Sequence, residues 1–228
     1  MLPAPLVDRL SLDKRSGRGR WRPLPRHALL QSGKWRPIDD GKLSRTNALT
    51  TVNEGIVNIH PELMLVIARA LVCAVLRRTQ EYPAWFAFEM AVEDWLKGFG
   101  QLAPTKQDLV YIALQLPTSG HWRYSQLRGL PFGLGAAVNQ FSRVPSFISA
   151  VCRRLLYILV AHYVDDDAGI ELSLLRGHGP RSFRDLLGLL GIRLSDSKRQ
   201  AESTWATFLG HARDWSQAGD ARAYAGGH

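Results

Sequence analysis

One stretch of eleven residues, Ala161 to Glu171 (AHYVDDDAGIE), constrains the fold more than any other part of the sequence. An apolar run leads into Tyr163 and Val164, and three consecutive aspartates, Asp165 to Asp167, follow before Gly169. This pattern predicts a β-hairpin with acidic side chains at its tip. Because adjacent carboxylates repel each other, the tip needs either water or a divalent metal ion. From these residues alone, a solvated acidic turn or a weak Ca²⁺ loop built on Asp-x-Asp and a glycine is the commoner explanation.

A second motif lies upstream and favours a functional explanation of the acidic turn. Leu130 to Phe141 reads LPFGLGAAVNQF and is followed by SRVPSF. Together with the YVDD stretch that ends at Asp166, it resembles the palm domain of retroelement reverse transcriptases, which carries L-P-F-G-L-x-x-A-P-x-x-F and then Y-x-D-D. The interval between the motifs is long enough for a helix followed by a strand. Val138 departs from the pattern, since the family usually has proline there.

An apolar strand expected at Trp85–Val92 runs directly into Glu93 and Asp94. Asp94-Trp-Leu-Lys-Gly-Phe99 resembles motif A of the family, in which an aspartate is followed five residues later by an aromatic. The resemblance implies that Asp94 is a third metal-binding carboxylate and that Phe99 blocks the extra oxygen of a ribonucleotide. A capped helix start for Asp94 and a core aromatic for Phe99 are the alternatives. Gly100 stands where a basic residue is common in the family.

The sequence GKWRPIDDGKLSRTN resembles the fingers motif of the same family. In that motif the arginine, here Arg36, contacts the triphosphate of the incoming nucleotide, and Lys34 lies beside it. A guanidinium group suits the task because it offers a fixed array of donors to phosphate oxygens and stays charged. The alternative is that Arg36 only pairs with Asp39 or Asp40.

The segment Gly191–Lys198 resembles motif D and places Lys198 at the lysine position of the family, where it is a candidate to protonate the leaving pyrophosphate. A surface lysine without a role is the alternative. Thr207–Gly210 resembles motif E, the hairpin that grips the primer.

The remaining patterns predict further strands and helices. Strands are expected at His27–Gln31 and Lys34–Ile38, joined across Ser32-Gly33 as a hairpin, and at Leu109–Leu116 and Trp122–Leu127. Helices are expected at Pro61–Arg78, Val138–Tyr157 and Ser182–Leu190.

The formal net charge of +9 favours a polyanionic partner. Residues 1–25 lack a sustained helical or strand period, which predicts a flexible basic arm whose Arg15, Arg18, Arg20 and Arg22 could touch phosphates or could simply be solvated. The apolar runs are too short to cross a bilayer, and the N-terminus lacks the features of a signal peptide. We therefore expect no membrane partner and an intracellular location in the cytoplasm, the nucleus or both.

The resemblance implies a mixed α/β fold in which residues 26–210 form the fingers and a polymerase-type palm, with an antiparallel sheet packed on helices. Residues 211–228 would be a C-terminal tail, with the thumb absent or truncated. The implied activity is RNA-directed DNA synthesis from dNTPs on a primed RNA or DNA template, and other retroelement domains are further candidate partners. Two Mg²⁺ ions, or Mn²⁺ in their place, would be held by Asp94, Asp165 and Asp166.

The other residues that the resemblance assigns to the substrate site are Phe132, Gly133 and Tyr163. Small residues from Gly133 to Ala137 would let a nucleotide lie close to the backbone. Glu93 and Asp167 would be supporting or solvated groups. Two alternatives stay open: an RNA-templated RNA polymerase, against which Phe99 argues, and a degenerate remnant that binds nucleic acid without turnover.

Overall fold

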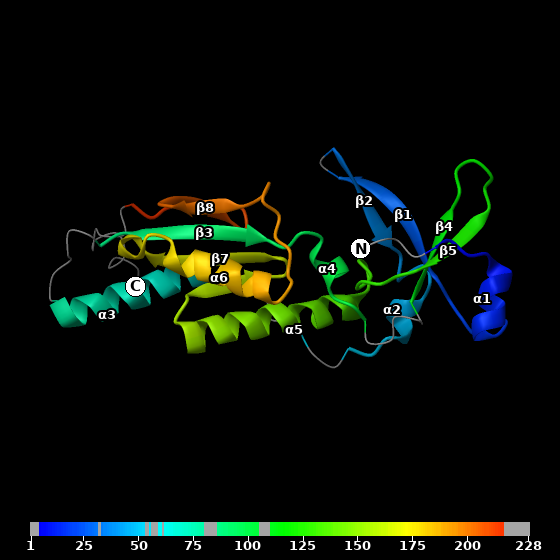
Figure 1. Cartoon of the computed structure of the whole chain (residues 1–228), viewed down its shortest axis with the longest axis horizontal. Coiled ribbons are helices and arrows are strands. Elements are labelled where there is room, and N and C mark those ends of the chain that lie inside the picture. The colour runs from blue at the N-terminus through cyan, green and yellow to red at the C-terminus, as the bar shows by residue number, and fades with distance from the viewer. Residues whose placement is uncertain are drawn as a thin grey trace. The chain divides into compact units, whose positions relative to one another are not determined.

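The computed structural model describes residues 5–31, 33–52, 55, 59–60, 62–79, 86–104 and 110–216 (Figure 1). The chain divides into two compact units. Unit 1 comprises Met1–Ile56 and Lys97–Ser142, and unit 2 comprises Val57–Leu96 and Arg143–His228. Each unit is built around its own four-stranded sheet, and helices accompany both.

The sheet of unit 1 has the strand order β2-β1-β4-β5. Its strands are β1 (Leu24–Gln31), β2 (Lys34–Asp39), β4 (Tyr111–Gln115) and β5 (Trp122–Gln126). The predicted hairpin of β1 and β2 is confirmed, and Gly33 occupies its turn with a φ of +73°, a conformation that glycine adopts without a steric penalty. Ser32 and Leu109, which were included in the predictions, lie outside the described residues. The short helices of this unit are α1 (Arg9–Ser16), α2 (Thr46–Leu49) and α4 (Gly98–Gln101).

Helix α1 forms within the segment that was expected to be a flexible arm. The side chain of Asp8 caps its first turn by accepting a hydrogen bond from the backbone N–H of Ser11 at 2.7 Å. Leu12 is fully buried, and α1 contacts β5. The cap and this one buried leucine stabilise a helix too short to show a hydrophobic period in the sequence.

The sheet of unit 2 is antiparallel throughout and has the order β6-β7-β3-β8. Its strands are β6 (Val160–Tyr163), β7 (Asp166–Leu172), β3 (Phe88–Asp94) and β8 (Gln200–Ser203). The hairpin predicted at the acidic stretch is therefore confirmed, with Val164 and Asp165 between its strands. A separate hairpin of β9 (Trp205–Phe208) and β10 (His211–Asp214) turns at Leu209 and Gly210.

Helix α3 (Leu63–Thr79) covers the core of unit 2 through Met64, Ala68 and Val72. These side chains cluster with alternate residues of β3 and β7, among them Phe88, Met90 and Ile170. The predicted helix over Pro61–Arg78 is confirmed from Leu63 onward, and Pro61 lies outside the described residues. The strand predicted at Trp85–Val92 is observed as Phe88–Asp94, so it extends through its terminal acids, while Trp85 is not described.

The remaining helices agree with the predicted positions. Helix α5 (Gly135–Val151) contains Pro145 in its interior and continues into the π-helical segment η2 (Cys152–Leu156). The short 3₁₀ segment η3 (Ser173–Leu175) and α6 (His178–Leu189) follow β7. No helix in the described part of the chain is long and apolar enough to cross a bilayer. The architecture is mixed α/β, as predicted.

Candidate active site

The pairing of β3 with β7 brings four acidic residues together as two cross-strand pairs. Asp94 lies opposite Asp166, and Glu93 lies opposite Asp167. Because successive side chains of a strand point to opposite faces, the two pairs lie on opposite faces of the sheet. Each pair therefore has its own environment.

The pair of Asp94 and Asp166 opens into a hollow of about 220 Å³. Its lining also includes Val92, Lys198, Gln200, Thr207, Phe208 and Leu209. Burial raises the pKa of Asp166 to about 6, and the negative charges of Asp165 and Asp94 add to this increase. A cation placed between these carboxylates would relieve their repulsion, so the pair suits a positively charged ligand.

Lys198 is the cation nearest to this pair among the described residues. Its Nζ lies 2.5 Å from Asp94 Oδ2, and its side chain remains 56% exposed. The backbone of Ser195 fixes this arrangement, since its N–H donates to Asp94 O at 2.8 Å and its carbonyl accepts from Lys198 N–H at 3.0 Å. The structure thus brings together Lys198 and Asp94, which the resemblance had assigned to the same site.

Asp165 lies in the tight turn between β6 and β7. Its carbonyl accepts a hydrogen bond from the backbone N–H of Trp95 at 2.9 Å, which ties the turn to the end of β3. Val164 has a φ of +54°, an unfavourable conformation for a β-branched residue. Such strain persists only where neighbouring contacts enforce it, and it is common at functional sites. On the neighbouring strand, Tyr163 pairs with Asp166 and packs against the core of unit 2.

The carboxylates Asp94, Asp165 and Asp166 would supply oxygen donors, which are the kind that Mg²⁺ and Mn²⁺ prefer. The raised pKa of Asp166 fits such a role, because a bound dication would favour its ionised form. Within the described ranges, however, no three His, Cys, Asp or Glu side chains are arranged as a metal-binding cluster. In this structure the ammonium group of Lys198 neutralises Asp94 instead.

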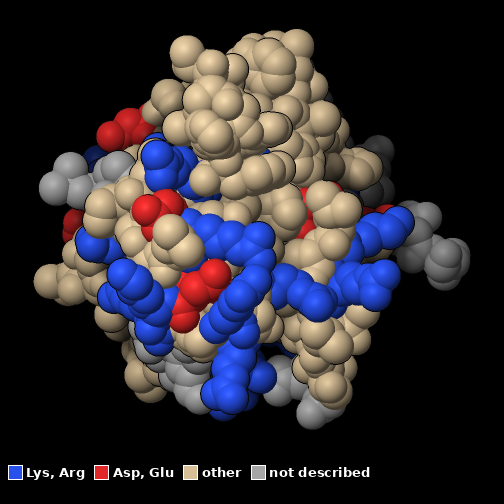
Figure 2. All heavy atoms as spheres, turned by 90° about the vertical axis from the view of Figure 1, so that its right-hand side faces the viewer, with Lys and Arg blue, Asp and Glu red and all other residues tan. Residues whose placement is uncertain are grey.

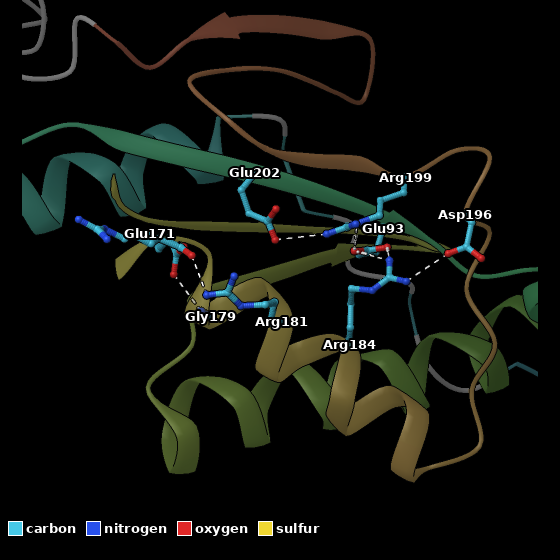
Figure 3. Close-up of polar contacts among 9 residues, drawn as sticks. Glu93, Glu171, Gly179, Arg181, Arg184, Asp196, Arg199 and Glu202 are labelled. Carbon is cyan, nitrogen blue, oxygen red and sulfur yellow. Dashed lines mark hydrogen bonds and ion pairs between the residues drawn. The ribbon is translucent and has the colours of Figure 1, made fainter. Parts of the chain in front are cut away.

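The second pair, Glu93 and Asp167, is buried on the other face of the sheet. Figure 3 shows Glu93 with the charged side chains around it. Glu93 is only 2% exposed, and Arg184 Nη1 from α6 donates to its two carboxylate oxygens at 2.9 and 2.7 Å. Arg199 Nε contributes a third hydrogen bond at 3.2 Å. The two arginines also reach Asp196 and Glu202, so Glu93 lies at the centre of an ionic network. Solvent exposure, one of the two predicted alternatives for Glu93, is excluded by this burial.

Asp167 is likewise buried, and its Oδ2 accepts a hydrogen bond from the indole Nε1 of Trp95 at 2.6 Å. Burial raises the pKa of Asp167 to about 7, and the bond from Trp95 partly offsets that effect. Asp167 and Glu93 thus hold the end of β3 in place on the sheet face opposite the Asp94–Asp166 pair. No local signal in the sequence predicts Arg184, Arg199 or Trp95 as partners of these two buried acids.

In unit 1, Lys34 and Arg36 are exposed on β2, opposite Gln31 and Leu29 of β1. The alternative that Arg36 pairs with Asp39 is not observed, because Asp39 is 1% exposed and forms a two-pronged ion pair with Arg26 at 2.7 and 2.9 Å. Asp40 instead accepts hydrogen bonds from the backbone of Lys42 and Leu43. The guanidinium group of Arg36 is therefore presented to solvent without an acidic partner among the described residues.

Phe99 belongs to an aromatic cluster of unit 1. Its ring stacks on Phe141 with centroids 4.6 Å apart, and it meets Phe132 edge to face at 5.5 Å. Gly133 has a φ of +124°, and a Cβ there would lie 2.1 Å from the carbonyl oxygen of Asp39. Close backbone packing against Asp39 thus explains this glycine without a nucleotide. Because these residues belong to unit 1 and the carboxylates to unit 2, each group is described separately.

The chain is similar in fold to solved reverse transcriptases. A foamy viral protease–reverse transcriptase, termed dRH, in complex with double-stranded DNA matches with a TM-score of 0.54 and 16% identity over 83% of this chain and 29% of that chain. A second foamy viral protease–reverse transcriptase with double-stranded DNA matches with a TM-score of 0.55 and 20% identity over 83% and 34% of the two chains. The chain therefore spans about a third of the length of these structures. No protein-family model and no curated protein match it. At these identities the comparisons show a reverse-transcriptase-like fold.

Proposed function

We propose that the chain is the fingers and palm of an RNA-directed DNA polymerase from a retroelement, which transfers a nucleotide from a dNTP to a primer 3′-hydroxyl. The observation that carries this proposal is the pairing of Asp94 with Asp166 across β3 and β7, beside Asp165 in the adjoining turn. The solved structures of similar fold include reverse transcriptases bound to double-stranded DNA, which supports a nucleic-acid substrate.

Asp94, Asp165 and Asp166 would hold two Mg²⁺ ions, with Mn²⁺ as an alternative. When bound, the ions would supply Lewis-acid activation of the 3′-hydroxyl and stabilisation of charge on the phosphoryl oxygens. The strained turn at Val164 fixes Asp165 relative to Asp166, and the Glu93 network holds the end of β3 from the opposite face. In this proposal the contribution of the chain would be to position the three carboxylates.

The roles of the other residues follow from their charge and exposure. Arg36 and Lys34 would bind the triphosphate, since both are exposed cations on β2. Lys198 would hold a proton on Nζ for the departing pyrophosphate. Phe99 would contact the sugar, while Phe132 and Gly133 would shape the loop beside it and Tyr163 would support the turn.

The proposal is tested with purified protein, an RNA template annealed to a DNA primer, dNTPs and Mg²⁺. We expect primer extension that requires Mg²⁺, prefers dNTPs over rNTPs and stops when one dNTP is withheld. Extension with rNTPs in preference to dNTPs would indicate an RNA-templated RNA polymerase instead.

A second candidate function is nucleic-acid binding without turnover. The ion pair that Lys198 forms with Asp94 favours this alternative. Template binding without any extension in the same assay would support it.

Replacement of Lys198 separates proton transfer from charge neutralisation. We expect Lys198→Met to slow single-turnover nucleotide addition by about a hundredfold, the scale of general acid catalysis. Lys198→Arg should remain nearly as slow, because a guanidinium group keeps the charge but does not release a proton. If Lys198→Arg restores the rate, Lys198 acts only as a counter-ion to Asp94.

Replacement of Phe99 tests its two assigned roles together. Phe99→Val should lower the free energy of unfolding by about 1 to 4 kcal/mol, because a stacked aromatic ring is removed from a packed cluster. We also expect the efficiency of rNTP incorporation to rise relative to that of dNTP. Phe141→Leu is the matched control, since it opens space in the same cluster and should leave the ratio unchanged. An unchanged ratio in Phe99→Val would assign Phe99 to the core alone.

A further inference from the structure

The net positive charge of the protein comes from one unit. Residues 1–56 and 97–142 contain 15 Lys and Arg against 6 Asp and Glu, whereas the rest of the chain contains 14 of each. The formal net charge of +9 therefore belongs to unit 1, and unit 2 is neutral. A polyanion is attracted to unit 1 before any specific contact forms.

Within unit 1, α1 and the loop that follows it carry a dense group of cations. We call Lys14, Arg15, Arg18, Arg20 and Arg22, together with Arg9, the α1 basic face. All six side chains are exposed. Figure 2, which views the protein from the side on which α1 lies in Figure 1, shows Lys and Arg side chains gathered there with few acids between them.

The segment that carries the α1 basic face is held against the sheet of unit 1. Val7 exchanges two backbone hydrogen bonds with Tyr124 of β5, at 2.8 and 2.9 Å. The ring of Trp21 packs edge to face on the same tyrosine with centroids 5.1 Å apart. Five of the six cations lie between these two anchors and Arg22 directly follows the second, so less conformational entropy is lost when they bind a ligand than in a free tail.

The acidic residues of this segment already have structural roles. Asp8 caps α1, and Asp13 accepts a hydrogen bond from Trp21 Nε1 at 2.8 Å. By contrast, Lys14, Arg18 and Arg20 form no ion pair with any acid in the described ranges. In unit 2, Arg184 and Arg199 are neutralised by Glu93. Arg9 of the α1 basic face lies 3.8 Å from Asp13, so the charge available to an external anion is that of Lys14, Arg18 and Arg20.

We propose that the α1 basic face binds the phosphodiester backbone of a nucleic acid, outside the segment 26–210 that carries the polymerase motifs. Arginine predominates in this face, and its planar fork fits phosphate oxygens. A membrane surface is a poorer fit, because Leu12 is buried and Leu10 is the one exposed apolar side chain of α1. Backbone contacts carry no sequence information, so RNA and DNA should bind with similar affinity.

This inference rests on the proposed function for the nature of the ligand, and it can be tested without catalysis. Binding of fluorescent RNA and DNA oligonucleotides to the full chain is measured by anisotropy in EDTA, without dNTPs, over a range of salt concentrations. The test variant is K14Q/R18Q/R20Q. The matched control is R69Q/R77Q/R78Q, which removes the same charge from exposed positions on α3 of unit 2.

We expect the test variant to bind both oligonucleotides at least about tenfold more weakly. The plot of log affinity against log salt concentration should become less steep, with the magnitude of its slope reduced by about 2. Each lost phosphate contact lowers that magnitude by about 0.7 to 0.9. The control should change the slope by less than about 0.5. Equal losses in the two variants, or no loss in the test variant, would overturn the inference. So would tighter binding of the wild type to phosphatidylserine vesicles than to the oligonucleotides.

The failure of this inference and the failure of the proposed function are distinguishable. If the wild type does not extend a primer but binding still depends on the test residues, the proposed role of the α1 basic face is supported and the proposed polymerase activity is rejected. If the wild type extends a primer and the test variant binds nucleic acid like the wild type, the polymerase activity is supported and the role of the α1 basic face is rejected.

Discussion

Asp165→Asn should abolish most primer extension while leaving the protein folded. The substitution keeps the shape of the side chain but removes a negative charge beside Asp166 and Asp94. If these carboxylates hold two dications, the barrier to nucleotide transfer should rise by several kcal/mol, which is a loss of at least about a thousandfold in rate. The measurement is single-turnover addition of one nucleotide at saturating Mg²⁺.

A stability measurement makes this result interpretable. The charge of Asp165 is one cause of the raised pKa of Asp166, so its removal should relieve repulsion and leave the free energy of unfolding unchanged or slightly higher at pH 8. Asp185→Asn is the matched control, because Asp185 is an exposed acid on α6 of the same unit. Near wild-type extension by Asp165→Asn would reject Asp165 as a ligand, and lost extension in Asp185→Asn would indicate a non-specific charge effect.

Local sequence signals predicted most of the fold. The hairpins β1–β2 and β6–β7 were recognisable because turn residues separate two strand-like runs, and α3 showed a clear helical period. Strand β10 was not predicted, since its residues were assigned to a C-terminal tail. Helix α1 was not predicted, since its eight residues bury only Leu12 and its stability depends on contacts with β5. A tertiary contact of that kind leaves no periodic trace in the sequence.

Two residues of the candidate site were predictable because each lies at the end of a strand that the sequence itself predicts. Asp94 and Asp166 were expected together, and the register of β3 with β7 places them opposite each other. The partners of Glu93 were not predictable, because Arg184 and Arg199 lie 91 and 106 residues further along the chain. An arginine that neutralises a buried acid cannot be distinguished in sequence from an exposed one such as Arg181.

Breaking the buried network around Glu93 should lower the stability of unit 2 measurably. Arg184→Met would leave Glu93, whose side chain is 3% exposed in the wild type, with the hydrogen bond that Arg199 donates at 3.2 Å. Removing one partner of a buried ion pair typically costs 3 to 5 kcal/mol, because a charge stays buried without compensation. Arg199 remains and Arg184 is itself 26% exposed, so we expect a loss of about 2 to 4 kcal/mol in the free energy of unfolding.

Urea denaturation measures this loss, and hydrogen exchange of the β3 amides would localise it to unit 2. Arg181→Met is the matched control on α6, since Arg181 donates only to the carbonyl of Arg176 among its described contacts and should change stability by less than about 0.5 kcal/mol. The double variant Glu93→Leu/Arg184→Met should recover most of the lost stability, because it removes the buried charge together with its partner. If Arg184→Met is as stable as its control, the network contributes little to folding. The position of Asp94, the neighbour of Glu93 on β3, would then have to be maintained by other contacts, such as the Ser195 backbone.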